Sequence, residues 1–398
     1  MPVINASDVH YDPYDADINA DPYPVYRRLR EEAPLFYNEE HDFYAVSRYD
    51  DIDRGLTDPE TFISGRGNIL ELIKTDMEIP SGVIIFEDPP IHATHRRLMA
   101  GVFSPRKVAA LEPRIRDFCA RSLDPLVGAG GFDFIAHLGA QVPMRTIGML
   151  LGIPENDQEW IRDRVDDGLR PESGQPMDVS KFFSDSDMFA AYIDWRAEHP
   201  SDDIMTDLLQ AEFVDAAGTR RRLTRDEILL YVNVIAGAGN ETTNRLIGWT
   251  GKVLADHPGQ RRELVENPGL IPGAIEEVLR YESPSHQIAR YVARDAEICG
   301  EVVPEGSAVL FLNGSANRDD RRYPDGDRFD IHRGPAGQPL TFGRGLHFCL
   351  GTALARMEGR IALEEVLKRF PEWEVDSDQA KFGPMATVRG WDALPVRT

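Results

Sequence analysis

The chain has 398 residues, 42% of them hydrophobic, and its formal net charge is −23. This length suffices for a sizeable core, and the negative charge argues against nucleic acid or an anionic membrane as partner, because both are bound by cationic surfaces. The first residues lack the basic and apolar regions of an export signal, and no apolar run reaches the roughly 20 residues of a membrane span. We therefore expect a cytoplasmic protein with no membrane anchor and no nucleic-acid partner.

The secondary-structure signals favour a mainly α-helical chain with some β structure (α+β). No repeat or flexible linker divides the sequence, so we expect one domain over residues 1–398, with an irregular arm over about residues 1–22. β-strand signals occur within residues 43–50 and 301–313; in the second range a Pro-Glu-Gly turn separates two runs rich in valine and leucine.

A long helix is predicted in the middle of the chain. Thr224 and Glu227 form a capping-box pattern, and no proline follows until Pro258. A helix of this length that is apolar on most faces must pass through the core. Its centre nevertheless contains Gly237 and Gly239, each of which costs about 1 kcal/mol relative to alanine. We therefore expect a flat or bulky group to approach the backbone there.

Two further helices are predicted towards the C-terminus. In residues 272–282, Glu277 and Arg280 lie three residues apart on one face, where they can pair with each other and reach a third partner. The last long helix extends from about Thr352 to Phe370 and ends before a proline.

Three cysteines occur, and their spacing fits neither a disulfide framework nor a zinc site. Cys119 and Cys299 lie in apolar patterns, where a cysteine is most often a small buried hydrophobe. Cys349 lies between Gly345 and Gly351, directly before the last helix. The positive end of a helix favours the thiolate that binds metals, and the glycines allow a sharp turn that aims N–H groups at the sulfur. The alternative is a glycine-rich turn with a buried, inert cysteine.

The stretch FGRGLHFCLG, residues 342–351, resembles the haem-binding loop of the cytochrome P450 family. The resemblance extends over nearly the whole chain and implies a mostly helical, single-domain prism with a small β-rich region. It implies haem b as cofactor, with the Cys349 thiolate as axial iron ligand, which favours cleavage of the O–O bond. Further cofactor contacts are then expected from Phe342, Gly343, His347 and Gly351.

Two segments resemble the parts of the family fold that contact the haem propionates. In EDPPIHATHRRLM, residues 87–99, His92 and Arg96 lie four residues apart on one helix face. The predicted strand IARYVARD contributes Arg290. On an isolated helix, His92 and Arg96 would more often belong to a solvated face.

EEVLR resembles the Glu-x-x-Arg signature of the family, which implies that Glu277 and Arg280 belong to a buried structural ion-pair network. The segment YPDGDRFDIHR, residues 323–333, is expected to supply the third partner, Arg328. Taken alone, a helical pair of this spacing is a surface contact of about 0.2–0.5 kcal/mol.

AGNETT, residues 238–243, resembles the oxygen-activating helix of the family. Activation of dioxygen consumes protons in a pocket that otherwise excludes water. The resemblance implies that Thr242 holds the hydrogen-bonded oxygen or an adjacent water, and that Glu241 brings protons from solvent. Ala238 and Gly239 would let the helix bulge and leave space for dioxygen. The alternatives are a threonine bonded back to the carbonyl four residues earlier and a glutamate in a salt bridge.

These features imply a monooxygenase that inserts one oxygen atom of O2 into a small hydrophobic substrate. The alternatives are a haem-thiolate peroxygenase and a non-catalytic haem-based ligand sensor, and the retained Glu241 and Thr242 favour the monooxygenase. No flavin or iron–sulfur motif occurs, so electrons from NAD(P)H are expected through a separate ferredoxin. We expect a monomer with a local basic patch for this partner. The candidates for the patch are Arg97, Arg106, Lys107 and Arg344.

Substrate contacts are expected from residues 62–86, 166–183 and 383–388 and from single positions on the central helix and a strand. The single positions are Val234, Ala238, His286 and Ile288. Most of these side chains are apolar, which suits a lipid-like, terpenoid, steroid or aromatic substrate without deciding among them. His286 either bonds a polar group of the substrate or, as is more common, faces solvent or bonds backbone.

Overall fold

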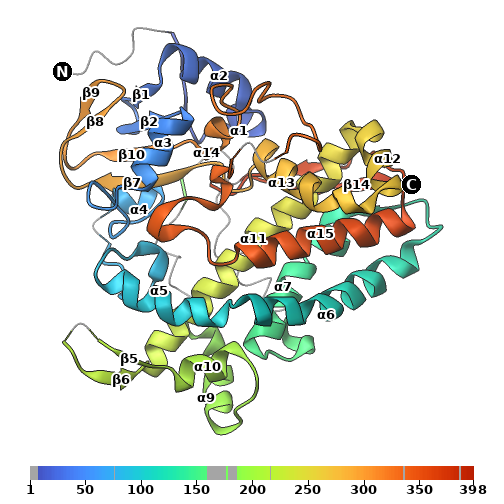
Figure 1. Ribbon diagram of the computed structural model, residues 1–398, viewed down its shortest axis with the longest axis horizontal. Helices are drawn as coiled ribbons and strands as arrows, with labels where there is room; N and C mark the ends of the chain where they lie inside the picture. The colour runs from blue at the N-terminus through green and yellow to red at the C-terminus, as the bar shows by residue number, and fades with distance from the viewer. Residues whose placement is uncertain are drawn as a thin grey trace.

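The computed structural model describes residues 8–75, 77–158, 176–177, 186–215, 217–334, 337–384 and 387–398. Most strands gather at one side of the molecule with the N-terminal part of the chain, and long helices fill the remainder (Figure 1). The helices are α1 (Ala16–Ala20), α2 (Tyr23–Glu32), α3 (Tyr49–Leu56), α4 (Leu70–Ile73), α5 (Ile91–Val102), α6 (Pro105–Leu123), α7 (Val142–Leu151), α9 (Ala190–Glu198), α10 (Ile204–Gln210), α11 (Arg225–Asp256), α12 (Pro258–Glu266), α13 (Ile271–Tyr281), α14 (Asn313–Ala316) and α15 (Thr352–Arg369).

The largest sheet has the strand order β1-β2-β10-β7-β3, in which β2 and β10 are parallel and the other neighbours antiparallel. All residues of β2 and β10 are buried, which explains their uninterrupted apolar runs. Both strand predictions are confirmed, and residues 301–313 contribute to two different sheets. The strands are β1 (Leu35–Asn38), β2 (Phe43–Val46), β3 (Phe62–Ile63), β4 (Gly131–Asp133), β5 (Glu212–Val214), β6 (Arg220–Arg222), β7 (Ile288–Val292), β8 (Ala296–Ile298), β9 (Glu301–Val303), β10 (Ala308–Phe311), β11 (Glu374–Val375), β12 (Lys381–Phe382), β13 (Trp391–Ala393) and β14 (Pro395–Arg397).

The N-terminal segment is more ordered than its composition indicates. Asp15 caps α1 by accepting hydrogen bonds from the N–H groups of Asp17 and Ile18. Tyr11 is buried, and its hydroxyl donates to Gln287 Oε1 at 2.7 Å. The prediction of a wholly irregular arm is therefore wrong for residues 8–22.

The central helix α11 has 32 residues and begins with the predicted capping box, in which Thr224 and Glu227 bond each other's backbone. It crosses the middle of the molecule (Figure 1). Two of its glycines allow the segment before α7, which contains Phe134 and Ile135, to pack closely against α11. A Cβ added at Gly248 would lie 2.7 Å from Ile135 Cδ1, and one added at Gly251 would lie 2.7 Å from the Phe134 ring.

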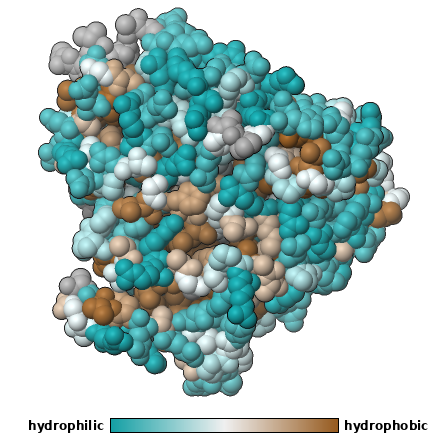
Figure 2. Space-filling view, in the orientation of Figure 1, coloured by the Kyte–Doolittle hydropathy of each residue, from teal (hydrophilic) through white to brown (hydrophobic). Residues whose placement is uncertain are grey.

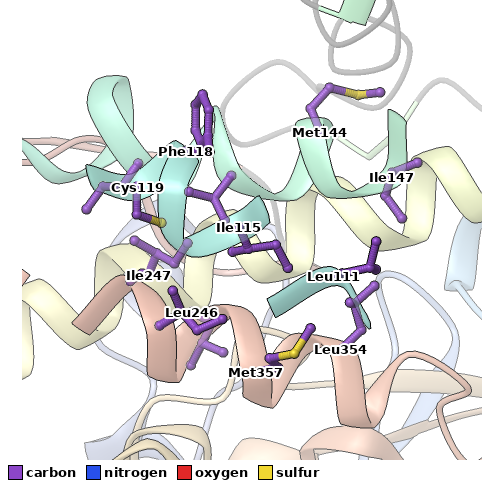
Figure 3. Close-up of a cluster of buried hydrophobic side chains, with 14 of the residues drawn as sticks. Leu111, Ile115, Phe118, Cys119, Met144, Ile147, Leu246, Ile247, Leu354 and Met357 are labelled. Atoms are coloured by element: carbon purple, nitrogen blue, oxygen red, sulfur yellow. The ribbon is translucent and has the colours of Figure 1, made fainter. Parts of the chain in front are cut away.

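The helical core lies where α6, α7, α11 and α15 meet (Figure 3). Leu111 and Ile115 of α6 face Leu246 of α11 and Leu354 of α15 across this cluster. Cys119 belongs to it and is fully buried, as predicted. The same prediction is wrong for Cys299, which is exposed and donates to Asp51 Oδ2 at 3.2 Å.

The start of α15 fixes the position of Cys349. Because α15 packs against α6, α11 and α13, the loop before it is anchored to the main helical core. None of the helices in the described ranges combines the length and apolar character needed to cross a bilayer.

Candidate functional site

Cys349 lies three residues before α15 in a loop that its own backbone holds closed. Its N–H donates to the Phe342 carbonyl at 2.9 Å, and its carbonyl accepts from the Thr352 hydroxyl at 2.7 Å. Gly343 and Gly345 have φ angles of +68° and +62°, where glycine is favoured. A Cβ at Gly345 would also lie 2.7 Å from the Leu56 carbonyl oxygen. The loop is the sharp turn that the sequence predicts.

The Cys349 side chain is accessible, yet the surrounding protein largely desolvates it. This desolvation raises the pKa of the thiol, against the opposing effects of the Gly351 N–H, the Thr352 hydroxyl and the guanidinium groups of Arg96 and Arg356. The sulfur therefore borders an internal space and not the outer surface. The predicted N–H contact with the sulfur is present at Gly351, but its lowering effect on the pKa does not outweigh burial. A bound metal cation is the influence that removes the proton from such a thiol.

Four basic side chains gather beside this loop. His92 and Arg96 come from α5, Arg290 from β7 and His347 from the loop itself. The rings of His92 and His347 are 4.4 Å apart between centroids. Arg96 donates to the Phe348 carbonyl, and Arg290 donates to the Ala289 carbonyl at 2.8 Å. Within the described part of the chain, none of the four side chains forms an ion pair.

The electrostatics of this cluster indicate a missing anion. Burial, followed by the charge of Arg290, lowers the pKa of His347 to about 3. Burial also lowers the pKa of Arg290 to about 10, and burial together with Arg96 lowers the pKa of His92. Both ring nitrogens of His92 are buried, and neither has a hydrogen-bond partner among the residues that the structure describes. Since buried polar groups are normally satisfied, an anionic ligand is expected to complete this cluster.

The middle of α11 also has accessible side chains within an otherwise buried part of the helix. Ala238 is exposed although most of the helix around it is buried, and Thr242, one turn later, is partly exposed. Figure 2 shows apolar side chains gathered in a hollow in the middle of the view, where the loop before α15 meets α5 and α11 in Figure 1. The hydroxyl of Thr242 donates to the Ala238 carbonyl at 2.9 Å, and its oxygen can still accept a hydrogen bond. The back-bonded alternative for this threonine is therefore realised.

The glycine beside Ala238 has a packing role. A Cβ at Gly239 would lie 2.6 Å from Ile147 Cδ1 of α7. The prediction that Gly239 leaves space for dioxygen is wrong, because α7 approaches there. The expected bulge is also absent, since α11 is α-helical from Arg225 to Asp256.

Glu241 is buried and forms an ion pair with Arg245, one turn further along α11. Neither of its two oxygens has a hydrogen bond of good geometry with any described residue, so the contact with Arg245 is one of charge and proximity. Arg245 also donates to Asp392 Oδ1 at 2.8 Å. The salt-bridged alternative for this glutamate is therefore the one that the structure adopts.

The predicted ion-pair network of Glu277 and Arg280 is present, but its third partner differs from the predicted one. Arg280 Nε and Nη2 donate to the Glu277 carboxylate at 2.7 and 2.8 Å, and both side chains are buried. The third partner is Arg333, whose Nε lies 3.0 Å from Glu277 Oε1. The prediction of Arg328 is wrong: its side chain is 69% exposed and pairs with Asp330, while its carbonyl accepts from both Arg280 and Arg333.

Comparison with known proteins identifies the family. The family model described as cytochrome P450 matches residues 269–388. A putative cytochrome P450 123 of Mycobacterium tuberculosis is 37% identical over 390 residues, covering 97% of this chain and 96% of the relative. The chain belongs to the cytochrome P450 family. The cytochrome P450 monooxygenase PikC of Streptomyces venezuelae is 33% identical, with coverage of 96% and 92%.

Solved cytochrome P450 structures share the fold of the whole chain. CYP109Q5 of Chondromyces apiculatus superposes with a TM-score of 0.86 at 34% identity, covering 98% of both chains. A mutant of P450 EryK in complex with erythromycin B gives 0.87 at 31% identity, covering 96% of this chain and 97% of that one. The protein is thus a bacterial haem-thiolate monooxygenase with the mainly helical fold that the sequence resemblance implies.

The residues of this cytochrome P450 fit a haem. A porphyrin supplies most of the ligands of its own iron, and its two carboxylates match the anion that His92, Arg96, Arg290 and His347 lack. The accessible Cys349 side chain supplies a single sulfur ligand next to that cluster.

The predicted substrate contacts of this cytochrome P450 come together in part. Ile288, Ile69 and Thr387 line one small pocket, so residues 62–86, β7 and the segment 383–388 meet. Val234 packs beside the cluster of Leu72, Val83 and Phe86. Residues 166–183 lie outside the described residues except for 176–177.

His286 has surroundings of a different kind. It is 4% exposed, lies beside Tyr26 of α2 and Gly314 of α14, and interacts with the Pro284 backbone. Burial, with a smaller effect of Arg389, lowers its pKa to about 3. The solvent-facing alternative for His286 is therefore wrong, and its Nδ1 has no hydrogen-bond partner among the described residues.

The predicted basic patch is reduced to two residues. Arg97 and Arg106 are exposed and form no ion pair with any residue that the structure describes. Lys107 pairs with Asp207, and Arg344 Nε lies 2.8 Å from Asp53 Oδ1. The charges of Lys107 and Arg344 are thus partly neutralised within the chain.

Sequence reasoning missed Arg245, Asp392 and Arg333. The sequence carries one signal for Arg245, its spacing of four residues from Glu241 on a predicted helix. Asp392 reaches its partner from strand β13 and Arg333 reaches its partner from a loop, and no spacing rule connects either residue with its partner.

Proposed function

We propose that Cys349 is the axial haem ligand of an enzyme that inserts one oxygen atom of O2 into a small hydrophobic substrate. In this proposal a separate ferredoxin delivers electrons from NAD(P)H. One observation carries it: an accessible sulfur at the start of α15 lies beside a buried cationic cluster without an anion. A thiolate-ligated haem satisfies both requirements at once, and when bound it supplies the oxygen chemistry.

The chain's residues hold the cofactor in three ways. His92, Arg96, Arg290 and His347 bind the propionates, which relieves the unsatisfied nitrogens of His92. Phe342 covers the sulfur side, and the Arg356 guanidinium lies 4.8 Å from the centroid of its ring. Gly343 and Gly351 let the backbone approach, and the Gly351 N–H is directed at the sulfur.

Thr242 and Glu241 deliver protons to the space next to the cofactor. Thr242 is fixed by its bond to the Ala238 carbonyl, so its oxygen accepts a hydrogen bond from a water or a protonated group in the adjacent space. Glu241 is the nearest acid along α11 and exchanges protons with solvent. Burial of the surrounding helix excludes bulk water from this pair.

The substrate is a small hydrophobic molecule. Support comes from the apolar cluster of Leu72, Val83 and Phe86, against which Leu230 and Val234 of α11 pack next to exposed Ala238. An apolar wall of this kind binds by area and discriminates weakly among lipid-like, terpenoid, steroid and aromatic molecules.

Turnover with a surrogate ferredoxin and its reductase tests this function. Apolar compounds are first screened for the spectral change that marks displacement of the iron-bound water. The proposal predicts that product from the best binder requires O2, NADPH and ferredoxin together. Product formed with hydrogen peroxide but not with O2 and electrons would indicate a peroxygenase, and tight binding without product would indicate a sensor.

The redox partner is expected on the face of α5 and α6. Arg97 and Arg106 are the predicted patch residues whose charge stays available there. Electron transfer from an acidic ferredoxin should slow with added salt, and Arg97→Gln with Arg106→Gln should lower both the rate and its salt dependence. A salt-independent rate would contradict docking at this face. We place the reaction in the cytoplasm, in a monomer, consistent with three free cysteines.

A further inference from the structure

Arg245 lies between two carboxylates from distant parts of the chain. On one side it pairs with Glu241 of the same helix. On the other side its Nη1 donates to Asp392 Oδ1 at 2.8 Å and to the Trp391 carbonyl, both in β13. The side chains of Glu241 and Arg245 are 6% and 1% exposed, whereas that of Asp392 is 25% exposed. The three groups therefore form a line from the core beside Thr242 to the protein surface.

The C-terminal hairpin, formed by β12 and β13, packs closely against Arg245. A Cβ at Gly390 would lie 2.6 Å from Arg245 Cδ, and one at Gly383 would lie 3.0 Å from its Nη2. The Gly383 N–H donates to the Gly390 carbonyl at 2.8 Å, which closes the hairpin over the guanidinium. This fit holds the arginine in one place and leaves it little freedom to turn away.

The chemistry of the guanidinium limits what Arg245 can do. Arginine stays protonated in proteins, so Arg245 cannot pass a proton from Asp392 to Glu241. Its effect is electrostatic, and it is strong because the pair is shielded from water. It holds the Glu241 carboxylate in place beside Arg245 on α11. Asp392 shares the same charge, so it weakens the hold of Arg245 on Glu241.

We propose that Arg245 and Asp392 are positioning residues for proton delivery in this cytochrome P450. Arg245 sets the resting position of Glu241, and Asp392 sets how readily Glu241 leaves that position to exchange a proton. The inference rests on the proposed role of Glu241 as the acid that serves Thr242. It goes further by placing the control of that acid on the C-terminal hairpin.

The first test uses the haem-loaded enzyme with an identified apolar substrate at fixed pH. Asp392→Asn removes the competing charge, so Arg245 holds Glu241 more tightly. We expect about a threefold loss in product formed per NADPH consumed and a larger solvent deuterium isotope effect, with unchanged substrate affinity. Asp392→Glu should restore both values. Asp378→Asn is the control, because Asp378 is exposed and makes no ion pair with the described residues.

The second test does not require turnover. In Arg245→Gln the buried Glu241 loses its counter-ion and should take up a proton, which infrared difference spectroscopy detects as a new protonated-carboxyl band. The band should be absent from the double variant with Glu241→Gln, which separates it from the signals of other acids. If Arg245→Gln does not fold, Arg245→Lys retains the charge but not the fork that reaches Asp392, and it should reproduce the Asp392→Asn effect.

The outcomes distinguish this inference from the proposed function. If Glu241→Gln leaves coupling unchanged, the role of Glu241 itself fails. If Glu241→Gln lowers coupling but Asp392→Asn and Arg245→Lys do not, only the positioning role is overturned. Equal losses in substrate affinity and in coupling for Asp392→Asn would also overturn it, because they would indicate general structural damage.

Discussion

His92 and His347 face each other with ring centroids 4.4 Å apart, and neither ring nitrogen of His92 has a hydrogen-bond partner among the described residues. Burial lowers the pKa of both rings, so both are neutral near pH 7. Two neutral donors beside Arg96 and Arg290 form a cradle for carboxylates. The unsatisfied nitrogens are therefore best explained as contacts reserved for the cofactor.

Replacing His92 with leucine should weaken haem retention. The variant loses one hydrogen bond to a propionate, so we expect haem to leave about tenfold faster when an excess of a haem-binding acceptor protein is present. His332→Leu is the matched control, because His332 is exposed and pairs with Glu263. Equal release rates for His92→Leu and the unmodified protein would show that His92 does not contact the haem.

Replacing Thr242 with the isosteric valine should uncouple electron consumption from product formation. The haem and substrate affinity should persist, because the hydroxyl bonds only the Ala238 carbonyl within the described residues. We expect most reducing equivalents to appear as peroxide, measured against NADPH consumed. Thr242→Ser should recover much of the coupling. Unchanged coupling in Thr242→Val would remove this residue from the proposed proton path.

Arg333 and Arg328 should differ sharply in their effect on stability. Arg333→Ala removes the contact with buried Glu277 and three hydrogen bonds to carbonyls of residues 324, 325 and 328, so we expect a loss of about 2–3 kcal/mol. Arg328→Ala should change the free energy of unfolding by less than about 0.5 kcal/mol. Denaturant unfolding followed by circular dichroism measures both, and equal effects would contradict the corrected network.

Glu358 should make stability depend on pH. It is buried on α15 with Oε1 unpartnered, and burial raises its pKa from 4.5 to about 8, against hydrogen bonds with Thr146 and Thr243. The folded state therefore binds a proton that the unfolded chain releases above pH 4.5. The contribution of Glu358 to stability is therefore fully present below pH 4.5 and is lost as pH rises towards 8, by an amount on the order of 4 kcal/mol.

The variant Glu358→Gln should remove this dependence while it keeps groups that bond both threonines. Unfolding free energies at pH 5 and pH 8 should differ less in the variant than in the unmodified protein, and at pH 8 the variant should be more stable. Glu372→Gln, an exposed position, serves as control. Parallel pH profiles for Glu358→Gln and the unmodified protein would contradict the raised pKa.

Local rules predicted the elements and motifs that depend on neighbouring residues. The capping box at Thr224, the length of α11 and the pair of Glu277 with Arg280 all follow from spacing along a helix. The sharp turn before Cys349 could be predicted from its glycines, because Gly343 and Gly345 adopt positive φ angles that favour glycine.

Contacts between distant segments were beyond these rules. Gly239 signals a close approach, but only the packing of α7 shows that Ile147 is the neighbour. Arg328 and Arg333 lie in the same loop, and its turns decide which guanidinium reaches Glu277. The same holds for Arg344, whose partner Asp53 lies on α3.

The absorption spectrum of the reduced, carbon-monoxide-bound protein tests the central claim most directly. Thiolate ligation by Cys349 predicts the long-wavelength band that distinguishes this haem class, and Cys349→Ser should abolish it while folded protein remains. A long-wavelength band that survives in Cys349→Ser, or purified protein that binds no haem when supplied with it, would contradict the account.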